Sequence, residues 1–205
     1  VRLGWAHGDQ EVFTKQQMIE YFSLDHVGKK GAIFDQNKLD WINGVYLRET
    51  PDQELLDLIL KDVCPTLRSD VPQWHDASLL LLINIYKQRA KTVAELVSDI
   101  KALYKKPAAF ESADIAQWIT ADAIVHLKEL NTVLGEIKTF TADEITAKLK
   151  EWTKLKNIKI VAIAQPLRIS LLGKSSGPSV FELMAVVGKH ETLERIAHLL
   201  QSVEK

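Results

Sequence analysis

The chain has 205 residues, of which 46% are hydrophobic and 26% are charged, as in an ordinary globular protein large enough for one or two cores. No apolar run approaches the roughly 20 residues that span a bilayer, and the first residues lack the apolar stretch of a signal peptide. The single cysteine, Cys64, excludes an internal disulfide framework and a cysteine-rich zinc site. We therefore expect a cytoplasmic protein that has no membrane partner.

The net charge of −1 conceals two basic segments. Residues 86–106 carry six Lys or Arg side chains and two acidic ones, and residues 145–174 carry seven basic side chains and one acidic one. Because local charge makes the field that attracts phosphates, these segments are compatible with nucleic-acid binding. A solvated helix surface is the other interpretation of each segment.

Four capping boxes predict helix starts along the chain. In this motif a Ser or Thr and a Glu or Gln three residues later each accept a hydrogen bond from the other's backbone N–H. Pro51, whose fixed φ suits the first helical position, follows the second box. Apolar residues recur at intervals of three and four after the boxes, as in amphipathic helices. The boxes begin at Thr14, Thr50, Thr92 and Thr141.

Another helix is predicted between the first two boxes. Asp35 is a suitable N-cap for a helix over residues 36–47. The spacing of Leu39, Ile42 and Tyr46 places them on one face, which we expect to be turned inward.

The C-terminal part contains three further predicted helices. Residues 142–156 form an amphipathic pattern with the lysines outward, Pro178 opens a helix that Gly188 closes, and a last helix occupies residues 190–202. Residues 158–164 are rich in β-branched side chains and could form an isolated strand, although no partner strand is visible.

These elements predict an all-α fold of two small helical domains. The helical periodicity breaks at residues 105–112, which include a proline and two alanines. We therefore expect a first domain over residues 1–106 and a second over residues 107–205.

The sequence shows no constellation of catalytic or metal-binding residues. None of the six histidines is paired at the spacing that places two imidazoles on one helical face. His7, Asp9 and Glu11 lie close together in sequence, but turn residues of a loop explain them more simply. Trp41 and Trp152 fall on apolar helical stripes, so we expect both in the core or at a domain interface. A stacking surface for bases is the alternative for these rings.

Three parts of the chain resemble glutamyl-tRNA synthetase, in order and at compatible distances. Near the start, residues 3–13, LGWAHGDQEVF, resemble a Leu-Gly-Trp-Ser segment of the family, and residues 39–48, LDWINGVYLR, resemble its Leu-x-Trp-Leu-Asn-Gly-x-Tyr-Ile-Arg. In the middle, residues 88–92, QRAKT, are similar to its Arg-x-Lys-Thr-Leu turn. Near the end, residues 164–173, AQPLRISLLG, are similar to its Gln-Pro-Leu-Arg-x-Ala-Leu-Thr-Gly signature.

The resemblance implies a C-terminal anticodon-binding region that forms a cage of two helical domains. The parent enzyme of this family ligates glutamate to tRNA with ATP and Mg²⁺, in a catalytic half that would precede this chain. The ATP-site signatures His-Ile-Gly-His and Lys-Met-Ser-Lys-Ser are missing here. We therefore expect this chain to carry no catalytic residue, metal or cofactor, and to act as a monomer whose partners are glutamate tRNAs and the catalytic half.

The resemblance also implies which residues contact the anticodon. Arg89 matches the family residue that contacts the first anticodon base, and Arg168 matches the signature arginine that contacts the third base. The family contacts the middle base through a Thr-Pro-Gly-Leu stretch, which here includes Gly177, Pro178 and Val180. Because the threonine hydroxyl is lost, recognition at Gly177 would use the backbone alone.

Lysines around these positions are candidates for contacts with the phosphate backbone, which would add salt-dependent attraction. Leu172 departs from the family signature, which has threonine there. The candidate lysines are Lys87, Lys91, Lys154, Lys156, Lys159 and Lys174.

Two alternatives to glutamate-specific anticodon recognition remain open. A helical protein–protein interaction module derived from the same domain would also have amphipathic helices with basic faces. A synthetase that charges both glutamate and glutamine tRNAs would share the same motifs, although arginine at position 89 favours glutamate alone. Independent catalysis by this chain is the least supported interpretation.

Overall fold

The structure is a computed structural model that describes residues 4–28 and 33–204. These residues form helices joined by loops, and their only β-type pairing is a single bridge between His7 and Gln10. The predicted all-α fold is confirmed. None of the described helices is long and apolar enough to cross a membrane.

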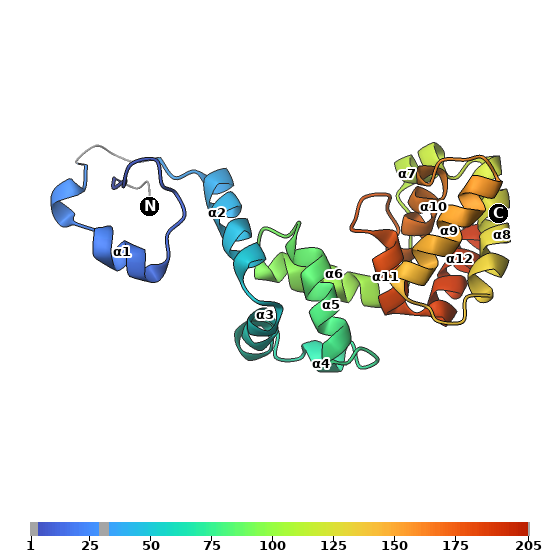
Figure 1. Cartoon of the computed structure of the whole chain (residues 1–205), viewed down its shortest axis with the longest axis horizontal. Coiled ribbons are helices and arrows are strands. Elements are labelled where there is room, and N and C mark those ends of the chain that lie inside the picture. The colour runs from blue at the N-terminus through green and yellow to red at the C-terminus, as the bar shows by residue number, and fades with distance from the viewer. Residues whose placement is uncertain (1–3, 29–32, 205) are drawn as a thin grey trace.

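The helices follow the chain from one end of an elongated molecule to the other (Figure 1). The N-terminal part contains α1 (Lys15–Tyr21), the short 3₁₀ helix Leu24–His26 and α2 (Gln36–Glu49). The middle part contains α3 (Asp52–Leu58), a π-helical turn (Ile59–Val63), α4 (Leu67–Asp70), α5 (Asp76–Lys87) and α6 (Val93–Tyr104). The C-terminal part contains α7 (Ser112–Trp118), α8 (Ala121–Gly135), α9 (Ala142–Leu155), α10 (Val161–Leu172), α11 (Val180–Val187) and α12 (Lys189–Val203).

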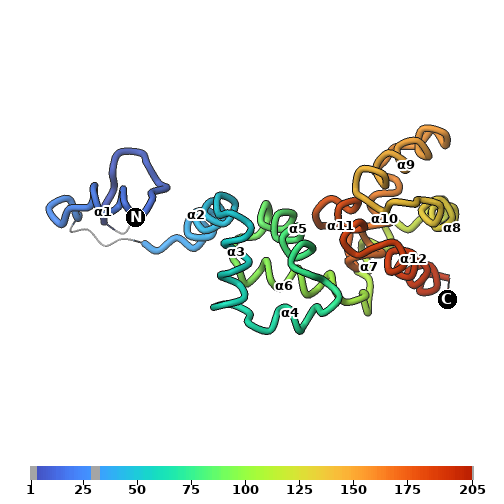
Figure 2. Tube along the Cα trace, turned by 60° about the horizontal axis from the view of Figure 1, so that its bottom comes forward, coloured from blue at the N-terminus to red at the C-terminus, as the bar shows by residue number. Residues whose placement is uncertain are grey.

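The middle and C-terminal parts share a continuous hydrophobic core. Helix α11 packs on α5 and α10 packs on α6, and Figure 2 shows the two groups of helices meeting there. The expected domain boundary at residues 106 and 107 falls in the segment between α6 and α7, and we retain that division as a proposal. Residues 1–3 and 29–32 of the expected first domain lie outside the described residues.

Most of the predicted helix starts are confirmed. Thr14 and Gln17 form a full capping box, and Asp35 accepts a hydrogen bond from the backbone of Lys38. At Thr92 and Thr141 the hydroxyl accepts from the residue three positions later. These caps are correct because they depend only on neighbours within one helical turn.

The capping box predicted at Thr50 is wrong. Helix α2 continues to Glu49, so Thr50 ends that helix, and its hydroxyl donates to the carbonyl of Tyr46 at 2.7 Å. Pro51 stands at the N-cap position of α3 without a side-chain cap. The hydroxyl of a Ser or Thr between two close helices can hydrogen-bond to the backbone of either helix, and here it bonds to the preceding one.

The prediction of which face of α2 is turned inward is also wrong. Leu39 and Tyr46 are exposed, whereas Gly44 and Leu47 are the buried residues of this helix. Trp41 is 47% exposed and lies outside the core, with the ammonium of Lys38 4.6 Å from its ring centroid. Trp152 is buried, as expected. The structure differs because α2 packs on α5, while the hydroxyl of Tyr46 on the same helix accepts a hydrogen bond from the backbone N–H of Phe13 in the segment before α1.

The C-terminal helices are close to prediction, with shifted starts. Helix α10 begins at Val161, which excludes the isolated strand over residues 158–164. The helix expected to open at Pro178 begins at Val180, and it ends at Gly188 as predicted. Residues 161–164 belong to this helix, in which Ile163 faces the core together with the following helical turns.

Candidate nucleic-acid interface

A buried arginine joins the middle and C-terminal parts of the molecule. Arg195, on α12, is 1% exposed. Its guanidinium donates to the carbonyls of Leu103 at 2.9 Å and Tyr104 at 3.1 Å, at the end of α6, and to Leu171 at 2.9 Å, at the end of α10. Helix C-termini leave carbonyls without partners and carry partial negative charge, so a cation is favourable there. Arg195 therefore fixes the ends of two helices that flank the candidate interface.

The loop between α10 and α11 is held from two sides. Asp114, on α7, accepts hydrogen bonds from the backbone N–H of Ser175 at 2.5 Å and from its hydroxyl at 2.7 Å. These bonds lower the pKa of Asp114, with the backbone bond as the main cause. Arg168 donates through Nε to the carbonyl of Pro178 and through Nη1 to that of Ser175, each at 3.0 Å. The loop thus has a defined shape before any ligand binds.

Gly177 lies where a side chain would not fit without movement. A Cβ at this position would be 2.6 Å from Cδ1 of Leu172 and 3.1 Å from Cδ of Arg168. A side chain at residue 177 would therefore require the Leu172 side chain to move, and glycine allows the loop backbone to pass close to α10 without this movement.

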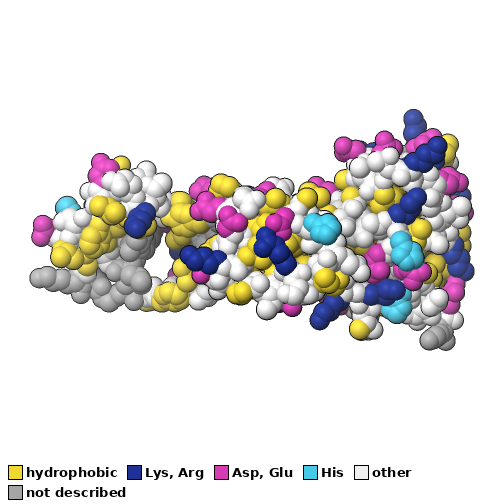
Figure 3. Space-filling model, turned by 90° about the horizontal axis from the view of Figure 1, so that it is seen from below, with side chains coloured by type: hydrophobic (Ala, Val, Ile, Leu, Met, Phe, Trp, Pro, Cys, Tyr) yellow, Lys and Arg dark blue, Asp and Glu magenta, His cyan; other side chains and the backbone are white. Residues whose placement is uncertain are grey.

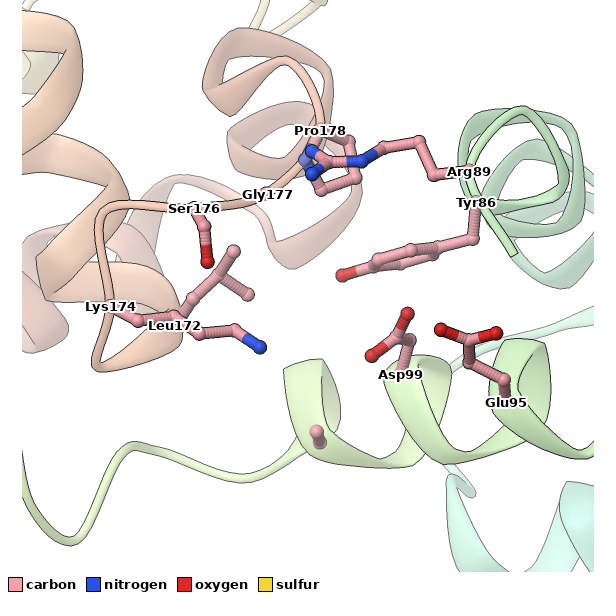
Figure 4. A pocket seen from close by; sticks show the side chains of 10 residues that line it. Tyr86, Arg89, Glu95, Asp99, Leu172, Lys174, Ser176, Gly177 and Pro178 are labelled. Carbon is pink, nitrogen blue, oxygen red and sulfur yellow. The ribbon is translucent and has the colours of Figure 1, made fainter. Parts of the chain in front are cut away.

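A pocket opens between this loop and helices α5 and α6 (Figure 4). Its volume is about 230 Å³. In Figure 4 the Tyr86 ring lies between Arg89 on one side and the carboxylates of Asp99 and Glu95 on the other, with Lys174 across the opening. The lining residues are Tyr86, Arg89, Glu95, Asp99, Ala102, Leu172, Lys174, Ser176, Gly177 and Pro178.

Several polar groups of this pocket have no partner within the described part of the chain. The side chains of Tyr86, Arg89, Asp99 and Lys174 make neither a hydrogen bond nor an ion pair with described residues. Burial raises the pKa of Asp99, and nearby Glu95 adds to the shift while Lys174 and Arg89 oppose it. Burial also raises the pKa of Tyr86, so its hydroxyl stays protonated. The pocket therefore presents both donors and acceptors to a ligand.

Arg89 and Arg168 both lie near Pro178. Arg89 lines the pocket beside Pro178, and Arg168 holds the carbonyl of the same residue. The pKa of Arg168 is lowered mainly by burial and further by the charge of Arg89. The guanidinium has five donors, and the Nη2 donors of Arg168 make no hydrogen bond with described residues, whereas Nε and Nη1 are used.

The other residues singled out from the sequence lie in different surroundings. Val180 is 1% exposed at the start of α11, so its side chain belongs to the core. Lys87 is 7% exposed, donates to the carbonyl of Thr50 and pairs with Asp52, which removes its ammonium from the surface. Lys174 lines the pocket.

The remaining lysines are on the surface, and two of them have acidic partners. Lys91 lies 3.9 Å from Asp40, and Lys156 lies 2.6 Å from Glu129. Lys154 and Lys159 make no ion pair with described residues. None of Lys91, Lys154, Lys156 and Lys159 lines the pocket.

Sequence reasoning missed the acidic side of the pocket. Glu95 and Asp99 are four residues apart and therefore share a face of α6, and Tyr86 and Arg89 share a face of α5 and its end. This spacing is visible in the sequence, but it also fits a solvated helix surface. Only the approach of the 174–178 loop shows that these faces are turned to a common site.

The described residues contain no cluster of three or more His, Cys, Asp or Glu side chains arranged for a metal ion. His7 stacks on Tyr21, with ring centroids 4.4 Å apart. Glu11 pairs with Lys38.

Comparison with known proteins agrees with the motifs found in the sequence. The chain is 35% identical over 204 residues to a glutamate–tRNA ligase of Rhodopseudomonas palustris and 36% identical over 197 residues to glutamate–tRNA ligase 2 of Rhodospirillum rubrum. Each match covers 96% of this chain and 43% or 42% of the relative, so the chain spans about two-fifths of the length of these proteins.

Solved structures and a family of domains give the same result. A glutamate tRNA ligase from Elizabethkingia meningosepticum superimposes with a TM-score of 0.83 at 27% identity, over 98% of this chain and 39% of that one. A glutamate-tRNA synthetase from Elizabethkingia anophelis superimposes with a TM-score of 0.80. Residues 54–200 match the family described as the anticodon binding domain. The resemblance inferred from the motifs is confirmed: the relatives that the chain matches are glutamate–tRNA ligases, and the chain belongs to the anticodon binding domain family.

Proposed function

We propose that this chain recognises the anticodon loop of glutamate tRNA as the C-terminal part of a glutamate–tRNA ligase. One observation carries the proposal. The pocket lined by Arg89, Lys174 and the 176–178 loop lies at the junction of two helical units, and it presents polar groups that make no hydrogen bond or ion pair with described residues. Single-stranded bases are read when they leave the stack and hydrogen-bond through their exposed edges. Such a pocket is suited to this task.

The rest of the enzyme would supply the reaction. The catalytic half would ligate glutamate to the tRNA with ATP and Mg²⁺, in the cytoplasm, and the enzyme would act as a monomer. Within this proposal Arg89 and Arg168 contact bases, and the backbone of Gly177 and Pro178 contacts the middle base. Lys174 then attracts the phosphate backbone of the RNA towards the loop.

The affinity of this chain for a glutamate-tRNA anticodon stem-loop tests the proposal. A stem-loop with one changed anticodon base is measured beside it at the same salt concentration, because salt alone changes such affinities. Tighter binding of the natural anticodon supports the proposal. Equal affinity for both RNAs would contradict it and favour the protein-interaction module.

Removing either arginine should reduce discrimination rather than binding in general. Arg89→Ala and Arg168→Ala should each cost about 1–3 kcal/mol with the natural anticodon, by analogy with base contacts in duplexes, and less with the changed anticodon. Arg48→Ala is the control, because Arg48 is exposed and does not line the pocket. Equal losses with both stem-loops would reduce the two arginines to phosphate contacts.

A further inference from the structure

A second hollow lies where α2, α3, the π-helical turn and the start of α6 meet. Its volume is about 440 Å³, and it shares no lining residue with the pocket between α5, α6 and the loop that follows α10. We call it the α2–α3 groove. Its lining residues are Asn43, Tyr46, Leu47, Thr50, Glu54, Leu55, Asp57, Leu58, Lys61, Asp62 and Val93.

Apolar side chains of the α2–α3 groove are open to solvent. Leu47 and Leu55 are buried, whereas Leu58 is 40% exposed and Tyr46 is 37% exposed. Exposed apolar surface that is surrounded by polar residues is typical of an interaction site. Helix α3 also continues directly into the π-helical turn, and such turns are rare and often occur at functional sites.

The charges around the groove are mainly acidic. Glu54, Asp57 and Asp62 line it together with a single cation, Lys61, and all four side chains are exposed. Glu54 and Asp62 make neither a hydrogen bond nor an ion pair with described residues. This rim attracts a cationic ligand and repels the phosphates of RNA.

The polar groups inside the groove are already used. The amide nitrogen of Asn43 donates to the carbonyl of Lys91, the hydroxyl of Tyr46 donates to that of Phe13, and the hydroxyl of Thr50 donates to that of Tyr46. A small-molecule site needs a few convergent polar groups to orient its ligand, and these groups do not supply them.

The walls of the groove determine the form of the ligand. They are helical, so they offer no open strand edge to which an extended peptide could add. An amphipathic helix needs no such edge, because it places apolar side chains at intervals of three and four into an apolar groove. Its polar flanks then lie against the rim, where cationic side chains complement the carboxylates.

We propose that the α2–α3 groove binds a positively charged amphipathic helix of a partner protein. The apolar face of that helix covers Leu58 and Tyr46, and its Lys or Arg side chains pair with Glu54 and Asp62. The inference goes beyond the proposed function and does not depend on it, because the groove and the pocket have no residue in common.

Selection of random peptides displayed on phage, with the full chain as the target, tests the inference. Enriched peptides should carry apolar residues at intervals of three and four, flanked by Lys or Arg. A synthetic peptide of the commonest sequence should gain helical circular dichroism when it binds. Enrichment of acidic peptides, enrichment without helical spacing, or no enrichment would overturn the inference.

A change in the apolar surface tests where this synthetic peptide binds. Leu58→Gln should weaken its binding by at least about tenfold, as for the loss of an apolar anchor. Leu155→Gln is the matched control, because Leu155 is also exposed at the end of a helix but lies outside the groove, and it should leave the affinity unchanged. Equal affinities of the two variants would overturn the inference.

A change in the rim tests the charge of the partner and does not require Leu58→Gln to fold. The double variant Glu54→Lys, Asp62→Lys should weaken binding of the peptide at low salt by at least about fivefold and reduce the salt dependence. The double variant Asp143→Lys, Glu151→Lys changes the net charge equally on exposed positions of α9 and should do neither. The same loss in both variants would overturn the inference, because net charge alone would explain it.

Two further measurements identify other occupants. Leu58→Gln should keep the affinity of the unaltered chain for the anticodon stem-loop, and a loss there would assign the groove to RNA. Self-association of the chain that Leu58→Gln abolishes would place a second copy in the groove. Either result would overturn the inference and leave the proposed function to be decided by its own test.

Discussion

At the scale of single residues, the carboxyl group of Asp99 is partly buried, which disfavours its charged form, and it lies near the cations Arg89 and Lys174. Burial raises the pKa of its carboxyl group, and no described residue donates to it. Groups whose environment opposes their charge are found often at binding sites, because selection for binding tolerates a loss of stability. The arrangement of Arg89 and Lys174 opposite Asp99 agrees with such a site.

Replacing this carboxylate should stabilise the folded chain at neutral pH. Because the folded pKa lies above the unfolded value, folded Asp99 binds more protons between the two values, and its contribution to stability falls as pH rises through that window. Asp99→Asn should therefore raise the free energy of unfolding at pH 7 by less than about 1 kcal/mol, since water screens a half-buried group. Urea denaturation at pH 7 and below the unfolded pKa measures the effect, and the gain should vanish at the lower pH.

At the scale of elements, the ends of helices determine the geometry of the pocket. Helix α6 carries Asp99 and ends at carbonyls held by Arg195, and α10 ends at a carbonyl held by the same side chain. Gly173, just after α10, has φ of +77° and accepts a hydrogen bond from the backbone of Glu111 at 2.9 Å. A Cβ at Gly173 would lie 2.8 Å from the carbonyl oxygen of Ala109. The linker between α6 and α7 is thus fastened to the loop that closes the pocket.

Arg195→Met should disturb both stability and recognition. The variant leaves carbonyls at two helix ends without a donor, which we expect to lower the free energy of unfolding by about 3 kcal/mol. At a temperature where the variant is still folded, the distance between labels on α5 and α12 should become more variable. Discrimination between matched and changed anticodons should fall at the same time.

Thr192→Val serves as the comparison for this variant, because Thr192 is also fully buried on α12 and its hydroxyl makes no hydrogen bond in the described structure. It should keep the label distance and the discrimination of the unaltered chain. A variant at Arg195 that loses stability but keeps full discrimination would show that this residue does not position the pocket.

At the scale of the whole molecule, positive charge is dispersed. On the face drawn in Figure 3, basic and acidic side chains are interspersed, in keeping with the net charge of −1. Surface lysines such as Lys156 are partly neutralised by ion pairs, whereas Lys154 and Lys159 make none with described residues. Under the proposed function, general attraction to RNA would depend on a few unpaired cations, and selectivity would depend on the pocket.

The double variant Lys154→Ala, Lys159→Ala should weaken binding equally for natural and changed anticodons. Each phosphate contact contributes about 0.7–0.9 to the slope of log affinity against log salt, so the slope should decrease by about 1–2. Affinities measured at several salt concentrations give the slope. Lys156→Ala should change it less, because this ammonium pairs with Glu129. A slope that the double variant leaves unchanged would remove these two lysines from the interface.

Much of the fold was predictable from the sequence. The helical class and the caps at Thr14, Asp35, Thr92 and Thr141 were correct, because periodicity and capping depend on residues within a few positions of each other. Prediction failed at Thr50 and on α2, where two neighbouring elements compete for the same side chains.

The sequence by itself determined the helical elements, the family and the candidate arginines, because each is encoded in short contiguous patterns. Only the tertiary structure showed that Asp99 on α6 and Gly177 in the loop face the same pocket, and that Lys87 is buried away from it. Those facts depend on how distant helices pack, to which Arg195 contributes through hydrogen bonds to carbonyls more than ninety positions away along the chain, at Leu103 and Tyr104. Contacts between residues so far apart arise from the packing of the whole core, and no local pattern in the sequence encodes them.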